Sequence, residues 1–143
     1  MNLTLLFATV FALSIHGTTS SPTESISKAF IKTFPSATNV SWSEEGKSYR
    51  AAFTENSVQF RVYYDKKGNI TKTIRYYRQE NLPVMILANI NKTFVDKKVF
   101  GVTEVSSADG TVYHIILEGA EDWTMVSCTS SYNLNVDDIF KKA

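Results

Sequence analysis

The chain has 143 residues, of which 13% are aromatic and 43% hydrophobic, and its formal net charge at pH 7 is +1. A chain of this length can bury a substantial core. Its near-neutral charge excludes a general nucleic-acid or membrane-surface binder, and its single cysteine, Cys128, excludes an internal disulfide framework.

The first segment is an apolar run from Leu3 to Ile15 that contains no charged residue. It is too short to span a bilayer, which takes about 20 apolar residues. The run is typical of the core of a secretory signal, and the small residues of Thr18–Ser20 supply a cleavage site. The sequence therefore predicts a signal peptide over residues 1–20 and export to the periplasm or beyond. A buried N-terminal element and a retained anchor are the alternatives, whereas a lipoprotein is excluded because no cysteine lies near the cleavage site.

A helix and four strands are predicted next. Ser21 can cap the helix, Glu24 completes a capping box, and Pro35 ends the helix. The apolar residues at helical spacing are Ile26, Ala29, Phe30 and Phe34. Four runs of alternating apolar residues follow, over 40–42, 49–53, 58–64 and 70–76. Their short Gly- or Asn-bearing links predict an antiparallel meander.

The same order then restarts. Leu82-Pro83 begins a second predicted helix, and strand-like runs cover 99–105, 111–117 and 123–128. A weak last run near Leu134 and Val136 is expected to be short or irregular. The sequence therefore predicts an α+β fold, a tandem duplication of a helix plus about four antiparallel strands in one domain, with repeats at 21–80 and 81–143. Together the repeats would form one large antiparallel sheet with both helices on one face.

A family resemblance rests on the order and spacing of several segments: Phe30–Pro35, Asn39–Trp42, Tyr49–Phe53 and Tyr64–Ile70. Together they resemble the beta-lactamase-inhibitor-like, PepSY-like proteins exported by Gram-negative bacteria, over nearly all of the chain after the signal. The resemblance implies tandem helix-plus-sheet units that present a sheet surface. It implies neither a catalytic residue nor the inhibition of any beta-lactamase.

Catalytic residues are sparse. His114 is the only histidine after the predicted signal, and one His with one Cys cannot form a zinc site of familiar spacing. Glu104 and Glu118 lie on neighbouring predicted strands and could face one another, but no cleft is predicted around them. The acidic pairs Glu121-Asp122 and Asp137-Asp138 are the only candidates for calcium, and such pairs are usually solvated. We therefore expect no enzyme, no metal and no cofactor.

A binding surface is the most informative prediction. The residues that alternate with the apolar positions of the first four runs should point away from the helices, and they include Arg50, Arg61, Tyr63, Arg75 and Tyr77. Arg and Tyr are enriched at interface hot spots, and the Arg fork matches carboxylates. Lys72 is a mismatch, because this assignment turns it toward the core. An ordinary solvated face, with Arg stems lying on Tyr rings, is the alternative.

Charge supports an acidic partner. Residues 21–80 carry ten Lys or Arg against six Asp or Glu, which gives +4, whereas residues 81–143 carry five against eight, which gives −3. The leading hypothesis is an exported binding module, of inhibitor-like architecture, that holds an acidic protein or peptide. The alternatives are a small-ligand sensor or carrier without catalytic activity, and an envelope protein that self-associates through its oppositely charged halves.

Overall fold

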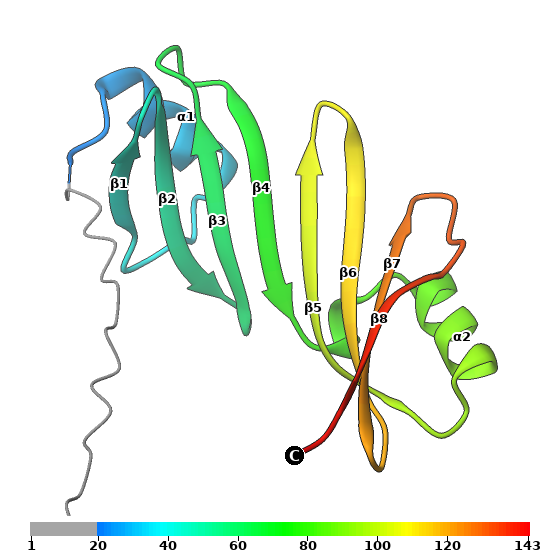
Figure 1. Cartoon of the computed structure of the whole chain (residues 1–143). Coiled ribbons are helices and arrows are strands. Elements are labelled where there is room, and N and C mark those ends of the chain that lie inside the picture. The colour runs from blue at the N-terminus through cyan, green and yellow to red at the C-terminus, as the bar shows by residue number, and fades with distance from the viewer. Residues whose placement is uncertain (1–19) are drawn as a thin grey trace, which may run out of the picture.

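Eight antiparallel strands form one sheet in which every strand pairs with its neighbours in the chain (Figure 1). The computed structural model describes residues 20–143. The first elements are α1 (Glu24–Thr33), β1 (Ser41–Glu45), β2 (Ser48–Glu55), β3 (Val58–Tyr64) and β4 (Ile70–Tyr77). A 3₁₀ turn, η1 (Gln79–Asn81), leads to α2 (Val84–Thr93), β5 (Lys98–Ser107), β6 (Gly110–Glu118), β7 (Asp122–Thr129) and β8 (Asn135–Lys141). The predicted α+β class is confirmed.

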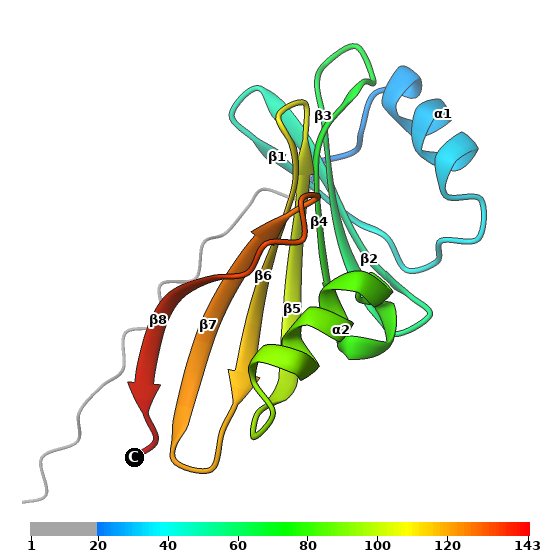
Figure 2. The same cartoon turned by 90° about the vertical axis from the view of Figure 1, so that its right-hand side faces the viewer.

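Both helices lie on the same side of the sheet, as predicted, and Figure 2 shows them together on one face. Ile26 and Phe30 of α1 are buried against β2 and β3, whereas Ile86 and Ile90 of α2 are buried against β5, β6 and β7. Each helix therefore covers its own half of the sheet. We call the opposite side of the sheet, which neither helix covers, the open face.

The core under α1 is mainly aromatic. The rings of Phe53 and Phe60 stack with centroids 4.9 Å apart, and the Phe30 ring meets the edge of Trp42 at 5.2 Å. Such edge and offset arrangements contribute about 0.5–1.5 kcal/mol beyond area burial. Trp42 consequently lies on the helix side, away from the open face.

The start of α1 differs from the prediction. Thr23, with an extended backbone at φ −63° and ψ 162°, is the N-cap residue, and no side chain caps the helix. The Thr23 hydroxyl lies 3.1 Å from the hydroxyl of Ser25. The capping box from Ser21 to Glu24 was therefore wrong, because Glu24 is already the first helical residue.

The last strand is longer than expected. β8 has 7 residues, the same length as β3, but a register shift at Met125/Val126 interrupts its pairing with β7. The irregularity was predicted correctly and the shortness was not.

Within the described residues, neither helix has the length and hydrophobicity that a bilayer span requires. The predicted signal segment lies outside the described residues apart from Ser20, and the repeat boundaries stay a prediction.

Candidate binding face

A cluster of cations and tyrosines lies on the open face of β3 and β4. We call it the basic–aromatic patch, and it consists of Arg61, Tyr63, Lys72 and Tyr76. The Lys72 Nζ atom lies 4.1 Å from the centroid of the Tyr63 ring, and the Arg61 Cζ atom lies 5.1 Å from that of Tyr76. Each cation–π contact of this kind contributes about 0.5–1 kcal/mol at an exposed site. The contacts therefore hold both cations against rings at the surface.

Two of the five predicted site residues lie on the other side of the sheet. In the register of β3 and β4, Arg75 pairs with Phe60 and Arg61 pairs with Ile74. Because paired residues point to the same face, Arg75 and Tyr77 share the helix side with Phe60. The predicted placement of Arg75 and Tyr77 on the open face was wrong. The mismatch at Lys72 was the available signal, since a one-residue slip reverses every side chain of a strand.

The physical reason for this error is the position of β4 between the two helices. Tyr77 is buried under α2, whereas Thr73 and Arg75 are only partly buried. The helix side of β4 can therefore carry polar residues, and its alternation does not mark the core. A prediction that assumes one face covered by helices and one face exposed to water therefore fails at β4.

The displaced arginine is neutralised inside the molecule. The Tyr77 hydroxyl donates to Glu104 Oε2 at 2.5 Å, and Arg75 Nη2 lies 3.2 Å from the same oxygen. Burial is the main cause that raises the pKa of the Tyr77 hydroxyl above its usual range, and the hydrogen bond to Glu104 raises it further. These three residues hold β4 to β5 at the junction of the two halves. The charge of Arg75 is therefore balanced by Glu104 within the protein.

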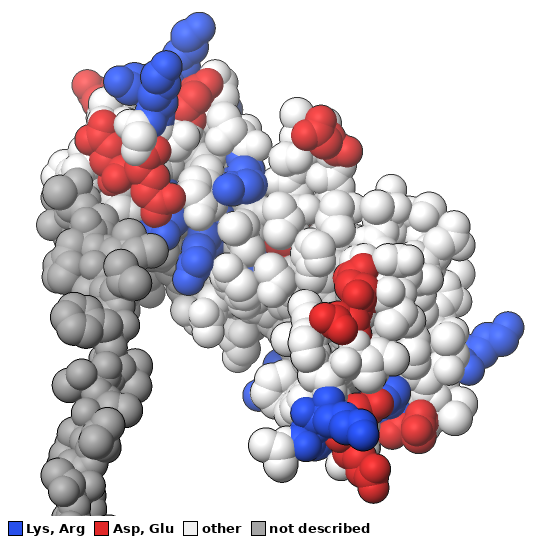
Figure 3. Space-filling view, viewed as in Figure 1, with Lys and Arg blue, Asp and Glu red and all other residues white. Residues whose placement is uncertain are grey.

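The remaining predicted residues differ in their charge partners. Arg50 Nη1 forms an ion pair with Glu45 Oε1 at 2.7 Å. Within residues 20–143, no carboxylate oxygen lies within 4.0 Å of a charged nitrogen of Arg61 or Lys72. The free positive charge of the face is therefore centred on Arg61 and Lys72. Figure 3 shows both Lys or Arg and Asp or Glu atoms on this side of the first half, and a largely uncharged middle.

A second cluster on the open face was not predicted from the sequence. It lies across β5 to β8 and consists of Phe100, Ile116, Trp123, Met125 and Phe140. We call it the aromatic patch. It borders a hollow of about 330 Å³. Its members are spread over 41 positions of sequence, and Phe100 occupies a break in the register between Val99 and Gly101, so no single alternating run reveals it.

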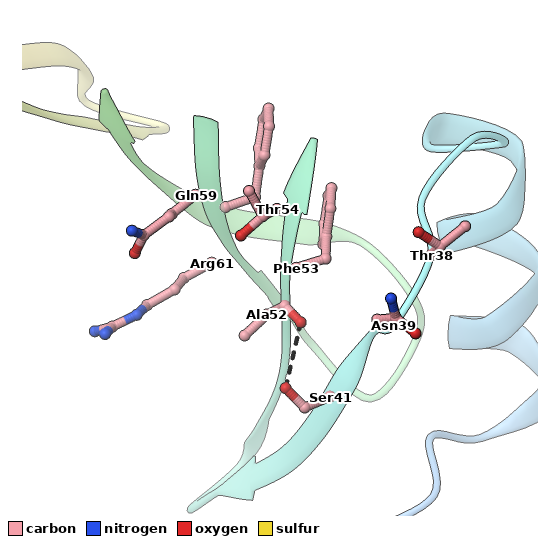
Figure 4. Close-up of a pocket in the computed structure, with 9 residues that line it drawn as sticks. Thr38, Asn39, Ser41, Ala52, Phe53, Thr54, Gln59 and Arg61 are labelled. Atoms are coloured by element: carbon pink, nitrogen blue, oxygen red, sulfur yellow. Dashed lines mark hydrogen bonds between the residues drawn. The ribbon is translucent and has the colours of Figure 1, made fainter. Parts of the chain in front are cut away.

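Two shallow hollows lie along the open face, and one of them connects the two patches. One of about 500 Å³ runs from Arg61 and Gln59 to the loop at Thr38 and Asn39; Figure 4 shows Arg61 and Gln59 projecting to the same side. A second hollow, of about 310 Å³, contains Gln59 and Tyr76 at one end and Phe100 and Ile116 at the other. The lining residues thus form a continuous belt across the open face.

Groups that could support catalysis are not brought together. Glu104 lies on the helix side, whereas Glu118 lies on the open face and accepts from Lys142 Nζ at 2.7 Å, so the two carboxylates do not face one another. His114 is exposed, and burial raises the pKa of the Cys128 thiol. Among residues 20–143, no three His, Cys, Asp or Glu side chains gather in a way that could hold a metal ion.

Solved structures share this architecture. A BLIP-like protein from Bacteroides fragilis is similar to the chain with a TM-score of 0.65 and 19% identity, over 87% of this chain and 90% of that one. The chain has the BLIP-like fold. A protein from Bacteroides eggerthii, provisionally named as periplasmic, has a TM-score of 0.61 at 18% identity and covers 85% of this chain with 90% of its own. A DUF2874 family protein from Bacteroides uniformis has a TM-score of 0.60 at 16% identity, with coverage of 85% and 90%.

The resemblance to beta-lactamase-inhibitor-like proteins is thereby confirmed at the level of the BLIP-like fold. No family profile matches the chain, and no curated protein matches it in sequence. Identities of 16–19% support the shared architecture alone. The PepSY-like part of the resemblance stays a prediction.

Proposed function

We propose that this protein is an exported binding module whose open sheet face captures an acidic segment of a protein or peptide. The observation that carries the proposal is the pair Arg61 and Lys72, which lie on tyrosine rings and have no carboxylate partner within the described residues. A cation that is already ordered loses less side-chain entropy when a carboxylate binds it.

The surroundings of these cations favour an anionic partner. The open-face positions of β3, β4 and β5 include Gln59, Ile74, Thr103 and Val105 but no Asp or Glu. Adjacent cations without interspersed acids raise the local potential and speed encounter with acidic segments. Arg50 extends the positive charge only weakly, because Glu45 already neutralises it.

Export is the second part of the proposal. It is supported by the predicted signal over residues 1–20 and by the provisional periplasmic name of one similar structure. A binding role, rather than a catalytic one, agrees with the separation of Glu104 from Glu118 and with the solvent-facing His114. The cations and tyrosine rings of the open face suit the recognition of charged and aromatic groups on a partner.

The test uses random-peptide display with the purified protein as bait. We expect the enriched peptides to contain clustered Asp or Glu, and we expect the double variant Arg61→Glu/Lys72→Glu to lose them. A matched control is Lys67→Glu/Lys92→Glu, which reverses two exposed cations away from the basic–aromatic patch. Peptides that lack acids, or equal binding by the patch variant and the control, would refute the proposal.

A small-ligand carrier is the second candidate, because the hollow of about 500 Å³ beside Arg61 could take a small anion. Isothermal titration of the protein with short dicarboxylates and with acidic peptides separates the two functions. Saturable binding of a free dicarboxylate, with no gain from the peptide, would favour the carrier.

A further inference from the structure

The aromatic patch leaves large apolar side chains exposed to water. The exposed fractions are 45% for Phe100, 38% for Ile116 and 48% for Phe140. Isolated apolar residues are common on protein surfaces, but a contiguous group usually marks an interaction site. These residues are contiguous across four strands, and both helices lie on the opposite side of the sheet. The core of this protein therefore does not use them.

The rings of this patch are already held in place. The Phe100 and Trp123 rings meet edge to face with centroids 4.9 Å apart. Arg78 Nη1 donates to the Phe100 carbonyl oxygen at 3.2 Å, and its Cζ atom lies 5.4 Å from the Phe100 ring centroid. On the other flank, Lys142 lies 4.8 Å from the Trp123 ring centroid. The register shift beside Phe100 is the kind of bulge that re-aims a side chain near functional sites.

The charged residues around the aromatic patch indicate which groups a bound segment carries besides its apolar side chain. Lys142 is neutralised by Glu118 at 2.7 Å, whereas Arg78 has no carboxylate within 4.0 Å among the described residues. Arg78 also borders the hollow that joins the two patches. The unpaired cations along the belt are then Arg78 at the aromatic end and Arg61 at the other. On the β8 side, Asp138 pairs with Met125 on the same face, so the positive charge is confined to the Arg78 side of the patch. An occupant that extends from Arg78 toward Arg61 gains from apolar surface and from negative charge.

We infer that the aromatic patch is the second half of one bipartite site, in which it takes a bulky apolar side chain of the same extended acidic segment that Arg61 and Lys72 hold. The occupant is a segment of another protein. The inference rests on the proposed function, which it deepens by fixing a second anchor and its distance from the first.

The spacing of the anchors follows from the sheet register. Arg61 aligns through Ile74 and Val105 with Val112 on β6, and Ile116 lies four residues further along that strand. Three strand spacings of about 4.8 Å and four residues of about 3.3 Å separate the positions by roughly 19 Å. An extended chain covers that distance in about six residues. The partner segment should therefore carry its acidic group about six residues from its apolar anchor.

The protein contains two tryptophans that report on opposite sides of the sheet. Trp123 belongs to the aromatic patch, whereas Trp42 packs against Phe30 under α1. The experiment follows the two indole N–H signals in a nitrogen-15 correlation spectrum during peptide titration. The first probe contains two aspartates, a glycine–serine spacer of about six residues and two leucines. The second replaces the leucines by serine, and the third replaces the aspartates by serine.

We expect the first probe to shift the Trp123 signal saturably and to leave the Trp42 signal unmoved. The second probe should shift the backbone signals of Arg61 and Tyr76 without moving the Trp123 indole. If the first probe shifts the signals of Arg61 and Tyr76 but not the Trp123 indole, the bipartite site is overturned and the proposed function stays intact. A third probe that binds at Trp123 as tightly as the first, with no binding by the second, would instead refute the proposed function.

Variants locate the apolar contact. Ile116→Ser and Phe140→Ser should each weaken the first probe at least about tenfold. The matched control is Ile139→Ser, which changes a 58% exposed residue beside Phe140 on the opposite side of β8 and should leave affinity unchanged. Equal losses in all three variants would refute the site. Sedimentation that shows a dimer abolished by Phe140→Ser, without any peptide response, would assign the patch to a second copy and overturn the inference.

Discussion

The substitution Tyr77→Phe tests whether the junction cluster of Arg75, Tyr77 and Glu104 is structural. The change keeps the buried ring, which is 5% exposed, and removes only the hydroxyl that donates to Glu104 at 2.5 Å. A hydrogen bond to a charged group contributes about 1.5–3 kcal/mol. Glu104 keeps its ion pair with Arg75, so we expect the free energy of unfolding to fall by about 2 kcal/mol.

The assay is urea unfolding followed by circular dichroism, with the denaturant slope compared between variants. An unchanged slope would show that only stability has changed. For a chain of this size, a loss of about 2 kcal/mol corresponds to a fall in Tm of about 8 °C. The same variant should bind acidic peptides as the parent does, because Tyr77 pairs with Val102 and lies with it on the helix side.

Tyr76→Phe is the matched control, because it removes the same atom from the neighbouring residue on the open face. Among the described residues, the Tyr76 hydroxyl makes no hydrogen bond, and we expect a change within about 0.5 kcal/mol. Equal stability of the two variants would refute the assignment of the cluster. A loss of peptide binding in Tyr77→Phe alone would refute the face on which we place it.

Three further predictions concern titration, reactivity and backbone conformation. Burial raises the pKa of Tyr64 to about 12 from its usual 10. The contribution of the neutral Tyr64 hydroxyl to stability is therefore complete below pH 10 and is lost as the pH rises toward 12. The variant Tyr64→Phe should flatten the alkaline end of a curve of unfolding free energy against pH. Cys128 is buried, and a thiol reagent should modify it only as fast as the protein unfolds, whereas rapid native labelling would contradict its burial. The variant Gly68→Ala should lower the free energy of unfolding by about 1–3 kcal/mol, because Gly68 has φ +89° and an added Cβ atom would lie 3.2 Å from the Ser25 carbonyl oxygen. The control Gly101→Ala adds a Cβ atom that meets nothing within 4 Å, so it should be neutral in the same urea assay.

Local sequence patterns predicted the regular elements well where one face of the element is covered. The alternation in β2 and β3 puts Ala51 and Phe53 inside and Arg61 outside, as the structure has them. The helix α1 begins and ends within a few residues of its predicted limits, and α2 begins directly after Leu82-Pro83, as predicted. These elements were predictable because burial on one face imposes a single period on the chain.

The candidate site was only partly predictable. Arg61 and Tyr63 lie on the predicted face, but Arg75 and Tyr77 do not, because the helix side of β4 falls between the two covered clusters. Lys72 replaces them beside Tyr63. The register of β4 depends on the irregular step between Tyr63 and Tyr64, which has no clear sequence signal.

The sequence by itself determined the class of the fold, the order of its elements and the side of the sheet that the helices cover, because periodic burial and turn residues act over short stretches of chain. Only the tertiary structure decided which charges are free and which apolar residues meet. Glu104 lies 29 positions from Arg75 but shares an ion pair with it, and Phe100 meets Trp123 across 23 positions. Such contacts depend on strand register and bulges, which are set by the packing of the whole sheet.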